Sequence, residues 1–558
     1  MRSHPESEGY LGSWMRELSA FSKQKCDVPV DMDIGDIPPE LILQLMPIFE
    51  KKYVGTDFSK FKCRMVVLGQ HWKNTHGIDT FTTMARMTTI KFLLSLGAIM
   101  DSDWIIIDVK EAFLTTKVNR VLPKRSVLDP DPPDLGYYVR RPPGATDAEM
   151  PYIMKPEAFI YGHPLAGAAG VGFGGDLKRV LVDMGCIPTN YDSQVYTLEE
   201  DGGTAIIATA VDDMPTFLIG TPALKAYIIR ELEKHYDITI DDPMRTVLGI
   251  EVQRDRIART VCLRQRGQME NLLNESLPGW ATCNLDELAV IPAQPRHELS
   301  AADAILDATP CSRAGIHRYN HEHGQLNWLL HTSPDFEQSV HERSRHLVSP
   351  SLYDAKCMAQ VVSCMARIRR LDLDGLVLGG TEGVKIISTV DTSYAGHKDL
   401  YSHTGGTIHM SHSTGAVMTL CKKLTVMADS AMVAEGLGAH MQIRHVLALR
   451  YFAGELGYSM DVPSEFYMDN EPFMKTITGQ RGCSSRSKHV LIQWKILKEA
   501  YDADQIQMLH LNTVNMVSDI LTKPLAREDW YRLRAVLLGQ SPMVLDTAVL
   551  DAVALPSN

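Results

Sequence analysis

Residues 204–220 have the sequence TAIIATAVDDMPTFLIG, in which two apolar runs flank the adjacent carboxylates of Asp212 and Asp213. Each run has the length and the β-branched and aromatic content of a strand, so the stretch predicts a β-hairpin with the aspartates in its turn. Aspartates are common in turns, and the pair alone therefore favours an ordinary polar turn over a functional site.

A third carboxylate ends another apolar run. The segment WIIIDVKEAFL predicts a buried strand that ends at Asp108 and continues into a helix. A compact sheet brings such strand ends together, and carboxylates that share one place repel each other unless cations neutralise them. Mg²⁺ prefers hard oxygen ligands of this kind. Two such ions about 3.5–4 Å apart would activate a hydroxyl and stabilise a leaving group, which predicts phosphoryl transfer.

Four more carboxylates occur downstream, each in a different predicted element. They are Asp391 in STVDTSYAG, Glu435 in SAMVAEGLGA, Asp469 in FYMDN and Asp519 in NMVSDILTKPL. Two metal ions held by such a set would support phosphodiester hydrolysis. The VDTS motif also fits an aspartic protease, but only as a homodimer, because the chain has no second such motif. That alternative leaves MDN and DILTKPL unexplained.

The composition is that of a globular protein with several domains. The chain has 558 residues, of which 45% are hydrophobic and 22% are charged. Its ten cysteines form no CxxC pair, which indicates a reducing compartment. The sequence shows neither a signal peptide nor an apolar stretch of the roughly 18 residues that a membrane helix needs. We therefore expect an intracellular protein, in the cytoplasm or the nucleus or both, that is not secreted.

Charge is distributed unevenly along the chain. The net charge of −12 by itself argues against binding to nucleic acid. However, residues 51–73 contain six Lys or Arg and one Asp, and residues 473–498 contain six Lys or Arg and no acid. Two such basic segments in an acidic chain are compatible with contacts to phosphates.

Two further motifs favour structural interpretations. The run GAAGVGFGG lacks the Lys-Ser/Thr end of a phosphate-binding loop and a strand directly before it, so it predicts a flexible loop. The histidines of HRYNHEHG, namely His317, His321 and His323, favour a structural role over a metal site.

The order of the N-terminal motifs resembles the reverse transcriptase of copia-type retrotransposon polyproteins. These motifs are KFKCRMVVLGQHW, TTIKFLL, IIIDVKEAFL, YGHP, AVDDM and VLGIEV. The resemblance implies a right-hand polymerase of fingers and palm. Its metal-binding residues would be Asp108, Asp212 and Asp213.

The same resemblance implies roles for residues around the metals. Lys62 and Arg64 of the fingers would contact the incoming triphosphate, and Phe113 would screen the sugar 2′ position. The segment LGIEV would form part of the primer-holding hairpin. Two departures stand out: the family usually has Tyr where this chain has Ala210, and more polar residues, with a Trp, after YGHP.

The downstream motifs resemble the ribonuclease H domain that follows reverse transcriptase in the same polyproteins. DILTKPL is the most specific of them. The resemblance implies that the second carboxylate set is catalytic. It also implies that Lys488 and His489, which match the family's Lys-His pair, contact the nucleic-acid backbone together with Arg486. Where the family has Asp-Ala-Asp-Trp, this chain has DTSY, so Ser393 replaces the second aspartate.

The predicted fold is α+β and multidomain: polymerase fingers and palm, a helical thumb or connection, and an α/β ribonuclease H-like domain. The expected ranges are an N-terminal extension (1–45), fingers and palm (46–255), a mostly helical thumb or connection (256–383), the ribonuclease H-like domain (384–530) and a C-terminal tail (531–558).

The implied function is RNA-directed DNA synthesis with ribonuclease H activity, with two Mg²⁺ or Mn²⁺ ions per active site. The expected partners are an RNA template, a DNA primer, the RNA–DNA hybrid and dNTPs, and no membrane. An alternative is a degenerate or domesticated retroelement protein that binds nucleic acid without catalysis. Ala210 and the altered Gly-rich segment favour that alternative, and the seven retained carboxylates oppose it.

Overall fold

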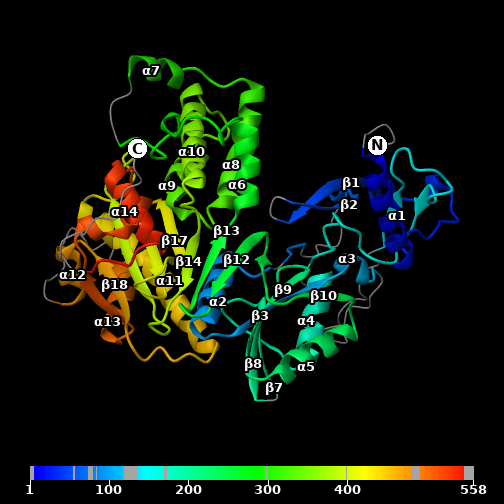
Figure 1. The fold of residues 1–558 in the computed structure, drawn as a ribbon, viewed down its shortest axis with the longest axis horizontal. Helices are drawn as coiled ribbons and strands as arrows, with labels where there is room; N and C mark the ends of the chain where they lie inside the picture. The colour runs from blue at the N-terminus through cyan, green and yellow to red at the C-terminus, as the bar shows by residue number, and fades with distance from the viewer. Residues whose placement is uncertain are drawn as a thin grey trace. The chain divides into compact units, whose positions relative to one another are not determined.

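The chain forms two compact units, each of which contains both helices and sheets (Figure 1). Unit 1 comprises Met1–Ala85 and Trp104–Met244, and unit 2 comprises Arg86–Asp103 and Arg245–Asn558. This mixture confirms the predicted α+β class. The computed structural model describes residues 6–54, 57–72, 80–82, 84–118, 136–168, 172–200, 202–295, 300–397, 399–479 and 491–545.

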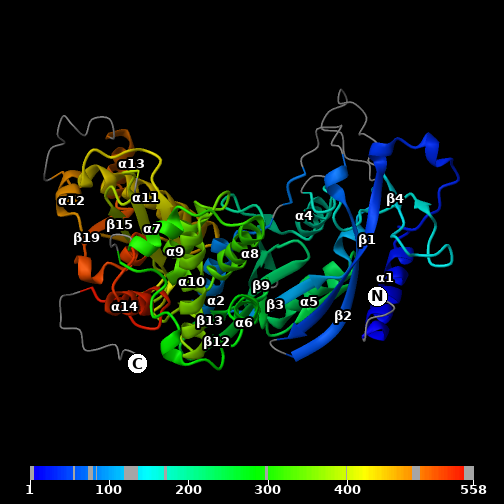
Figure 2. The ribbon, with the colours of Figure 1, turned by 90° about the horizontal axis from the view of Figure 1, so that it is seen from above.

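The first sheet of unit 1 is built on a long hairpin. Strands β1 (Ile42–Val54) and β2 (Asp57–Val67) pair antiparallel, with Glu50 opposite Lys62 and Ile48 opposite Arg64. Helix α1 (Ser7–Lys23) packs against β2, as Figures 1 and 2 show. The sequence pattern did not predict this helix. The remaining elements of this part are η1 (Ile34–Asp36), η2 (Pro39–Leu41), η3 (Gly69–His71), β4 (Tyr138–Arg140) and β5 (Ile153–Met154).

The second sheet of unit 1 has the strand order β10-β3-β9-β8-β7-β6. The predicted hairpin of residues 204–220 is present, because β8 and β9 pair antiparallel. Two amphipathic helices, α4 and α5, cover a hydrophobic core that includes Ile105, Ile107 and Phe173. The elements are β3 (Asp103–Val109), α3 (Ala112–Thr115), α4 (Phe173–Asp183), β6 (Ile187–Pro188), β7 (Val195–Glu200), β8 (Gly203–Ala208), β9 (Asp213–Ile219), α5 (Pro222–Glu233) and β10 (Ile238–Asp241).

The predicted flexible loop is partly helical. Helix α4 begins at Phe173, so Gly174 and Gly175 lie in its first turn. Residues 173–175 were therefore wrongly predicted, because the apolar side chains that follow them bury one face of α4 and extend the helix back through the glycines.

Unit 2 begins with a buried helix, α2 (Met87–Ile99), against a four-stranded sheet of order β11-β12-β13-β14. The backbone N–H of Gly379 donates to the Ser95 hydroxyl at 3.1 Å and joins β14 to this helix. Residues 246–255 form a short hairpin, in which Leu248 and Gly249 at the turn have positive φ. The strands are β11 (Thr246–Val247), β12 (Ile250–Asp255), β13 (Thr260–Arg264) and β14 (Leu376–Gly379).

Helices dominate the segment between β13 and β14. The longest, α10, starts at a capping box in which Ser351 and Asp354 exchange side-chain hydrogen bonds with each other's backbone N–H groups. The elements are α6 (Arg266–Ser276), η4 (Leu285–Glu287), α7 (Ala301–Asp307), α8 (Arg313–Leu329), η5 (Pro334–Phe336), α9 (Glu337–Ser344) and α10 (Leu352–Arg370).

The last part of unit 2 is a five-stranded sheet of order β17-β16-β15-β18-β19. The first three strands form an antiparallel meander, and β18 and β19 continue the sheet in parallel. The long helix α11 lies against β15 (Figures 1 and 2). A Cβ on Gly438 of α11 would overlap Thr392 of the sheet, so glycine permits this close approach.

The elements of this part are β15 (Ile387–Ser393), β16 (His403–His409), β17 (Ala416–Lys423), α11 (Ala431–Glu455), β18 (Ser464–Met468), α12 (Glu471–Ile477), α13 (Leu491–Asp502), β19 (Ile506–His510), η7 (Thr513–Asn515), η8 (Val517–Leu521) and α14 (Arg527–Leu537).

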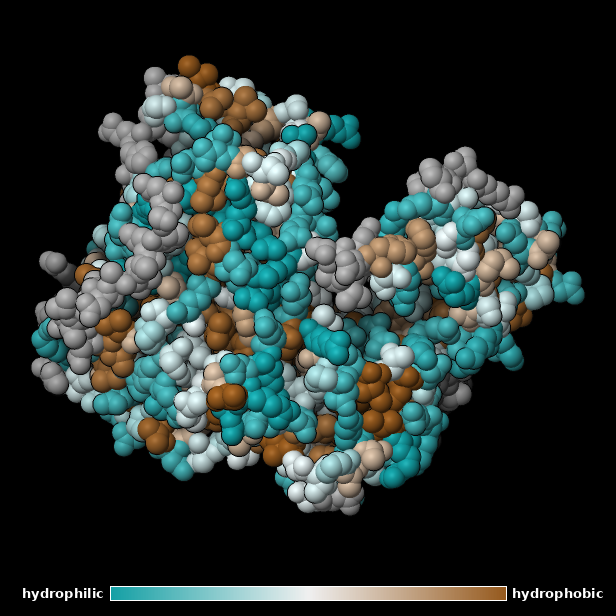
Figure 3. All heavy atoms as spheres, in the orientation of Figure 1, coloured by the Kyte–Doolittle hydropathy of each residue, from teal (hydrophilic) through white to brown (hydrophobic). Residues whose placement is uncertain are grey.

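Hydrophobic side chains gather in small groups among hydrophilic ones on the face drawn in Figure 3. Such scattering is ordinary for protein surfaces. Among the helices in the described part of the chain, none combines the length and the apolar character required to cross a bilayer.

A buried ion pair joins α14 to η5, the short helix directly before α9. The Nε atom of Arg534 lies 2.8 Å from Oδ2 of Asp335, and the two side chains are 3% and 0% exposed. We expect Asp335→Ala to lower the free energy of unfolding by about 3–5 kcal/mol, because the guanidinium would stay buried without its carboxylate. Urea denaturation of the full chain measures this loss.

The matched control removes a carboxylate from an exposed pair. Lys495 and Glu499 lie 3.4 Å apart on α13, with 72% and 64% of their side chains exposed. We expect Glu499→Ala to change the free energy of unfolding by no more than about 0.5 kcal/mol. Equal losses in the two variants would contradict the assigned role of the buried pair.

Candidate active sites

The first acidic site lies where three elements of unit 1 meet. Asp108 is near the end of β3, which lies between β9 and β10 in the sheet. The backbone N–H of Val109 donates to the carbonyl oxygen of Asp212 at 3.0 Å and so joins this strand end to the β8–β9 turn. The fold therefore brings Asp108 next to Asp212 and Asp213, although about a hundred residues separate them in the sequence.

The turn that carries the aspartate pair is strained. Val211 has a φ of 64°, a left-handed conformation that β-branched residues rarely adopt. The flanking residues hold it, because Ala210 N–H donates to the Asp213 carbonyl at 2.8 Å and Asp213 N–H donates back at 3.3 Å. Strain of this kind clusters at functional sites, where the surrounding structure sustains it.

Burial and mutual repulsion raise the carboxyl pKa values in this site. Burial raises the pKa of Asp213 to about 6, and the charges of Asp212 and Asp108 add to the shift. The pKa of Asp212 is also raised, first by burial and then by Asp108, while Lys62 and Arg64 act in the opposite direction. These two bases of β2 therefore lie close enough to the carboxylates to act on them.

The other predicted nucleotide contacts lie around this site. Arg64 is oriented by Glu50 on the neighbouring strand, with 3.2 Å between Nη1 and Oε2. Phe113, on the short helix after β3, packs edge-on against the ring of Tyr161 at 5.2 Å between centroids. Burial raises the pKa of Tyr161, and the charges of Glu17 and Asp212 add to this effect. Tyr161 thus belongs to the surroundings of the carboxylates, and its YGHP motif was the signal for it.

The second acidic site lies in unit 2, at the edge where β15 and β18 end. Ligand oxygens of Asp391, Glu435 and Asp469 lie within 4.8 Å of one another. They come from β15, helix α11 and the residue after β18. Asp519 is the fourth member, because its carboxyl interacts directly with Asp391, and burial raises its pKa. All four predicted carboxylates therefore converge.

Two oxygens in this site are buried without a partner. In the described residues, Oε2 of Glu435 and Oδ1 of Asp519 receive no hydrogen bond. Burial raises the pKa of Glu435 well above its usual range, and the charges of Asp391 and Asp469 raise it further. Buried oxygens without donors are costly, and an all-oxygen donor set is what Mg²⁺ and Mn²⁺ take. The residues present therefore fit divalent ions.

Threonine hydroxyls orient three of the seven carboxylates, a feature absent from the sequence predictions. Thr239 donates to Asp108 at 3.1 Å, Thr513 donates to Asp469 at 2.9 Å, and Thr522 donates to Asp391 at 2.8 Å. Thr522 lies in DILTKPL, so the motif held a signal for it, whereas Thr239 and Thr513 lie in no motif. Each hydroxyl fixes one carboxylate oxygen, which is the usual outer support of a metal site.

Asp519 lies in the middle of η8, a short 3-10 helix. Lys523, four residues later, places its Nζ 2.8 Å from Oδ2 of Asp519. A side-chain cation therefore lies directly against this carboxylate.

Three predicted contacts to nucleic acid, Arg486, Lys488 and His489, lie outside the described residues. Ser393 ends β15 and is half-buried. His321 lies at the surface, 3.2 Å from Glu275, and takes no part in either acidic site.

The raised pKa of Asp213 predicts how the metal-free stability of unit 1 depends on pH. Because the folded-state pKa exceeds the unfolded one, the protonated carboxyl favours folding below pH 3.8, and this advantage is lost as the pH rises through about 6. We expect Asp213→Asn to raise the free energy of unfolding at pH 8 in EDTA by about 1–2 kcal/mol after allowance for solvent screening. The gain should shrink towards zero near pH 4.

Thermal denaturation of the full chain at pH 4, 6 and 8 measures this effect. Asp183→Asn, which alters an exposed aspartate on α4, is the control and should show no such trend. A flat difference between Asp213→Asn and the wild-type chain across this range would refute the expectation.

Comparisons with known proteins agree with this geometry in unit 1. Residues 42–276 match the family model described as reverse transcriptase (RNA-dependent DNA polymerase). The chain is 24% identical over 491 residues to the retrovirus-related Pol polyprotein from transposon RE1 of Arabidopsis thaliana, covering 86% of this chain and 30% of that protein. It is 23% identical over 538 residues to the corresponding polyprotein from transposon TNT 1-94 of Nicotiana tabacum, covering 94% and 37%. The chain thus spans about a third of the length of these relatives.

Two solved structures are also similar. A foamy viral protease-reverse transcriptase in complex with an RNA/DNA hybrid is 11% identical, with a TM-score of 0.39, over 81% of this chain and 49% of that one. A ribonuclease H1 isolated from compost is 17% identical, with a TM-score of 0.21, over 25% of this chain and 92% of that one. The match of residues 42–276 to the reverse transcriptase model and the similarity to the two Pol polyproteins confirm the predicted resemblance of the chain to retrotransposon polyproteins.

Proposed function

We propose that unit 1 catalyses RNA-directed DNA synthesis and that the acidic site of unit 2 cleaves the RNA strand of RNA–DNA hybrids, as part of a copia-type retroelement. The observation that carries the proposal is the convergence of Asp108 with Asp212 and Asp213, inside the segment that matches the reverse transcriptase family. The second acidic site supports the nuclease half.

In the polymerase site, Asp108, Asp212 and Asp213 would hold two Mg²⁺ or Mn²⁺ ions. Bound ions of this kind activate the primer 3′-hydroxyl and stabilise the leaving pyrophosphate. Lys62 and Arg64 bring positive charge close to Asp212, where the triphosphate of a dNTP would sit. Thr239 keeps the Asp108 carboxylate in one orientation.

The Phe113 ring has the role of excluding a 2′-hydroxyl. Its edge packs against Tyr161, so it has little freedom to move away from the sugar. Ala210 leaves the primer side of the turn without the family's aromatic ring, yet its backbone still pairs with Asp213 and with Met84. The carboxylates are therefore held by backbone contacts that do not need that ring.

In the nuclease site, Asp391, Glu435, Asp469 and Asp519 would hold two ions that activate water for attack on the RNA phosphate. Thr513 and Thr522 orient two of these carboxylates. Arg486, Lys488 and His489 would position the hybrid through its backbone, which carries no sequence information. We propose that this activity takes place inside the cell, in the cytoplasm or nucleus.

Two reciprocal variants separate the two activities. We expect Asp108→Asn to lower primer extension on an RNA template by at least about 100-fold, because the loss of a metal ligand removes several kcal/mol of stabilisation. The same variant should cleave a labelled RNA–DNA hybrid at the wild-type rate. Asp469→Asn should lose hybrid cleavage and extend the primer at the wild-type rate.

Each variant serves as the folding control for the other. Folded wild-type chain that extends no primer with either Mg²⁺ or Mn²⁺ would overturn the polymerase proposal. If that chain still binds hybrid and cleaves none of it, the alternative of a catalytically inactive nucleic-acid-binding protein is supported instead.

Thr522 provides a finer test of the nuclease site. We expect Thr522→Val to weaken the apparent Mg²⁺ affinity in hybrid cleavage by about 10–100-fold, because Asp391 loses its orienting hydrogen bond. Thr522→Ser keeps the hydroxyl and should remain close to the wild type. The cleavage rate is measured as a function of Mg²⁺ concentration. Equal Mg²⁺ midpoints for Thr522→Val and Thr522→Ser would rule out this positioning role.

A further inference from the structure

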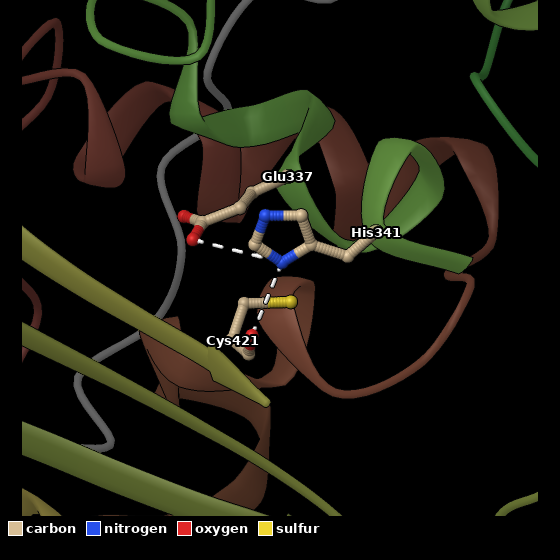
Figure 4. Close-up of side chains that lie close together, drawn as sticks. All are labelled: Glu337, His341 and Cys421. Carbon is tan, nitrogen blue, oxygen red and sulfur yellow. Dashed lines mark hydrogen bonds and ion pairs between the residues drawn. The ribbon is translucent and has the colours of Figure 1, made fainter. Parts of the chain in front are cut away.

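Three side chains of unit 2, outside both acidic sites, point toward one another where helix α9 faces strand β17. Figure 4 shows the carboxylate of Glu337 and the ring of His341 on α9 beside Cys421 on β17. Glu337 and His341 are four residues apart, which places them on one face of the helix. One ligand atom from each of the three residues lies within 4.8 Å of the other two. Carboxylate oxygen, imidazole nitrogen and sulfur are all ligands of zinc.

The carboxylate of Glu337 is buried and incompletely paired. The residue is 9% exposed, and its Oε2 atom receives no hydrogen bond from the described residues. Its Oε1 atom lies 3.9 Å from Nδ1 of His341. Burial raises the pKa of the Glu337 carboxyl, while the nearby charges of His341 and Lys91 act in the opposite direction.

A chain of hydrogen bonds directs a proton donor at the sulfur of Cys421. Arg345 lies 2.8 Å from Nδ1 of His397, and a guanidinium only donates, so Nδ1 accepts. A neutral ring whose Nδ1 accepts a hydrogen bond carries its proton on Nε2. His397 therefore donates from Nε2 to Nδ1 of His403 at 3.1 Å. His403 in turn donates from Nε2 to the sulfur at 3.3 Å.

The same logic sets the tautomer of His341. Its Nδ1 lies 3.1 Å from the carbonyl oxygen of Cys421, which accepts only, so Nδ1 carries the proton. The lone pair is then on Nε2. Histidine ligands of metals commonly donate their other N–H group to a backbone carbonyl, and thiolate ligands commonly receive hydrogen bonds. The Nδ1–H of His341 therefore supplies an outer contact of the kind found in metal sites and leaves Nε2 as the nitrogen with a free lone pair.

We propose that Glu337, His341 and Cys421 bind a zinc ion between α9 and β17, with the fourth position taken by water. Thiolate and imidazole select zinc over magnesium, so this site differs in kind from the two acidic sites. Zinc bonds of about 2.0–2.3 Å place neighbouring ligand atoms about 3.3–3.6 Å apart, so the side chains need to close by at most about 1.5 Å. On binding, the S–H bond of Cys421, which donates to the carbonyl of Leu521, breaks. Its proton leaves to solvent as the sulfur–zinc bond forms.

The proposed ion would tie the helical segment of unit 2 to the sheet that carries Asp391. Glu337 and His341 lie on α9, whereas Cys421 lies on the third strand of the meander that begins with β15. Because the site uses no residue of the polymerase or nuclease centres, it goes beyond the proposed function. The zinc proposal can therefore be tested without measuring polymerase or nuclease activity.

Cobalt substitution tests the proposal directly on the full chain. The chain is stripped with a chelator and then titrated with Co²⁺ in buffer that contains Mg²⁺. We expect a sulfur-to-cobalt charge-transfer band in the near ultraviolet, which the oxygen ligands of the acidic sites cannot produce. Zn²⁺ should abolish the band stoichiometrically, and elemental analysis after gel filtration should find one zinc per chain.

Matched variants identify the ligands. Cys421→Ser should abolish the band, and Cys262→Ser, which alters a half-buried cysteine on β13 outside the cluster, should retain it. His341→Asn provides a second test if Cys421→Ser fails to fold, because the His341 side chain is 32% exposed and tolerates replacement. A folded wild-type chain without the band, or a band that persists in Cys421→Ser, overturns the proposal.

Discussion

Repulsion between buried carboxylates is the constraint on which the rest of this structure depends. Seven acidic side chains are gathered into two places, and burial raises the pKa of Asp213, Glu435 and Asp519. Each unit therefore holds charge in a position that costs folding free energy when no cation is present. The divalent ions proposed for these sites would offset that cost.

The fold keeps the carboxylates in place with contacts from distant segments. Thr239 and Thr522 come from outside the strands they support, and each donates to one carboxylate oxygen. Lys523 lies against the carboxylate of Asp519. Burial raises the pKa of Asp212, and the charges of Lys62 and Arg64 oppose that rise. Val211 keeps its strained backbone because the strands on both sides prevent the turn from relaxing, and this turn carries Asp212 and Asp213. These contacts lie within the unit that carries the carboxylates, so each acidic site is supported by its own unit.

Local patterns predicted the elements that carry the sites better than the elements around them. The β8–β9 hairpin was predicted because two apolar runs of strand length flank a polar turn. Helix α1 was missed because its polar composition hides the few buried residues, such as Trp14 and Phe21, that dock it on the sheet. The Gly-rich segment predicts a loop because glycine has a low helix propensity. The apolar face of the residues that follow nevertheless extends α4 back to Phe173.

The sequence by itself identified seven candidate carboxylates, their order in the chain and the strands or helices that carry most of them. Only the tertiary structure decided that Asp391, Glu435 and Asp469 meet within 4.8 Å and that Thr522 orients Asp391. It also decided that His341 lies beside Cys421, eighty residues away. The reason is physical: periodicity reports which face of an element is buried, whereas sheet order and helix packing set which buried faces touch.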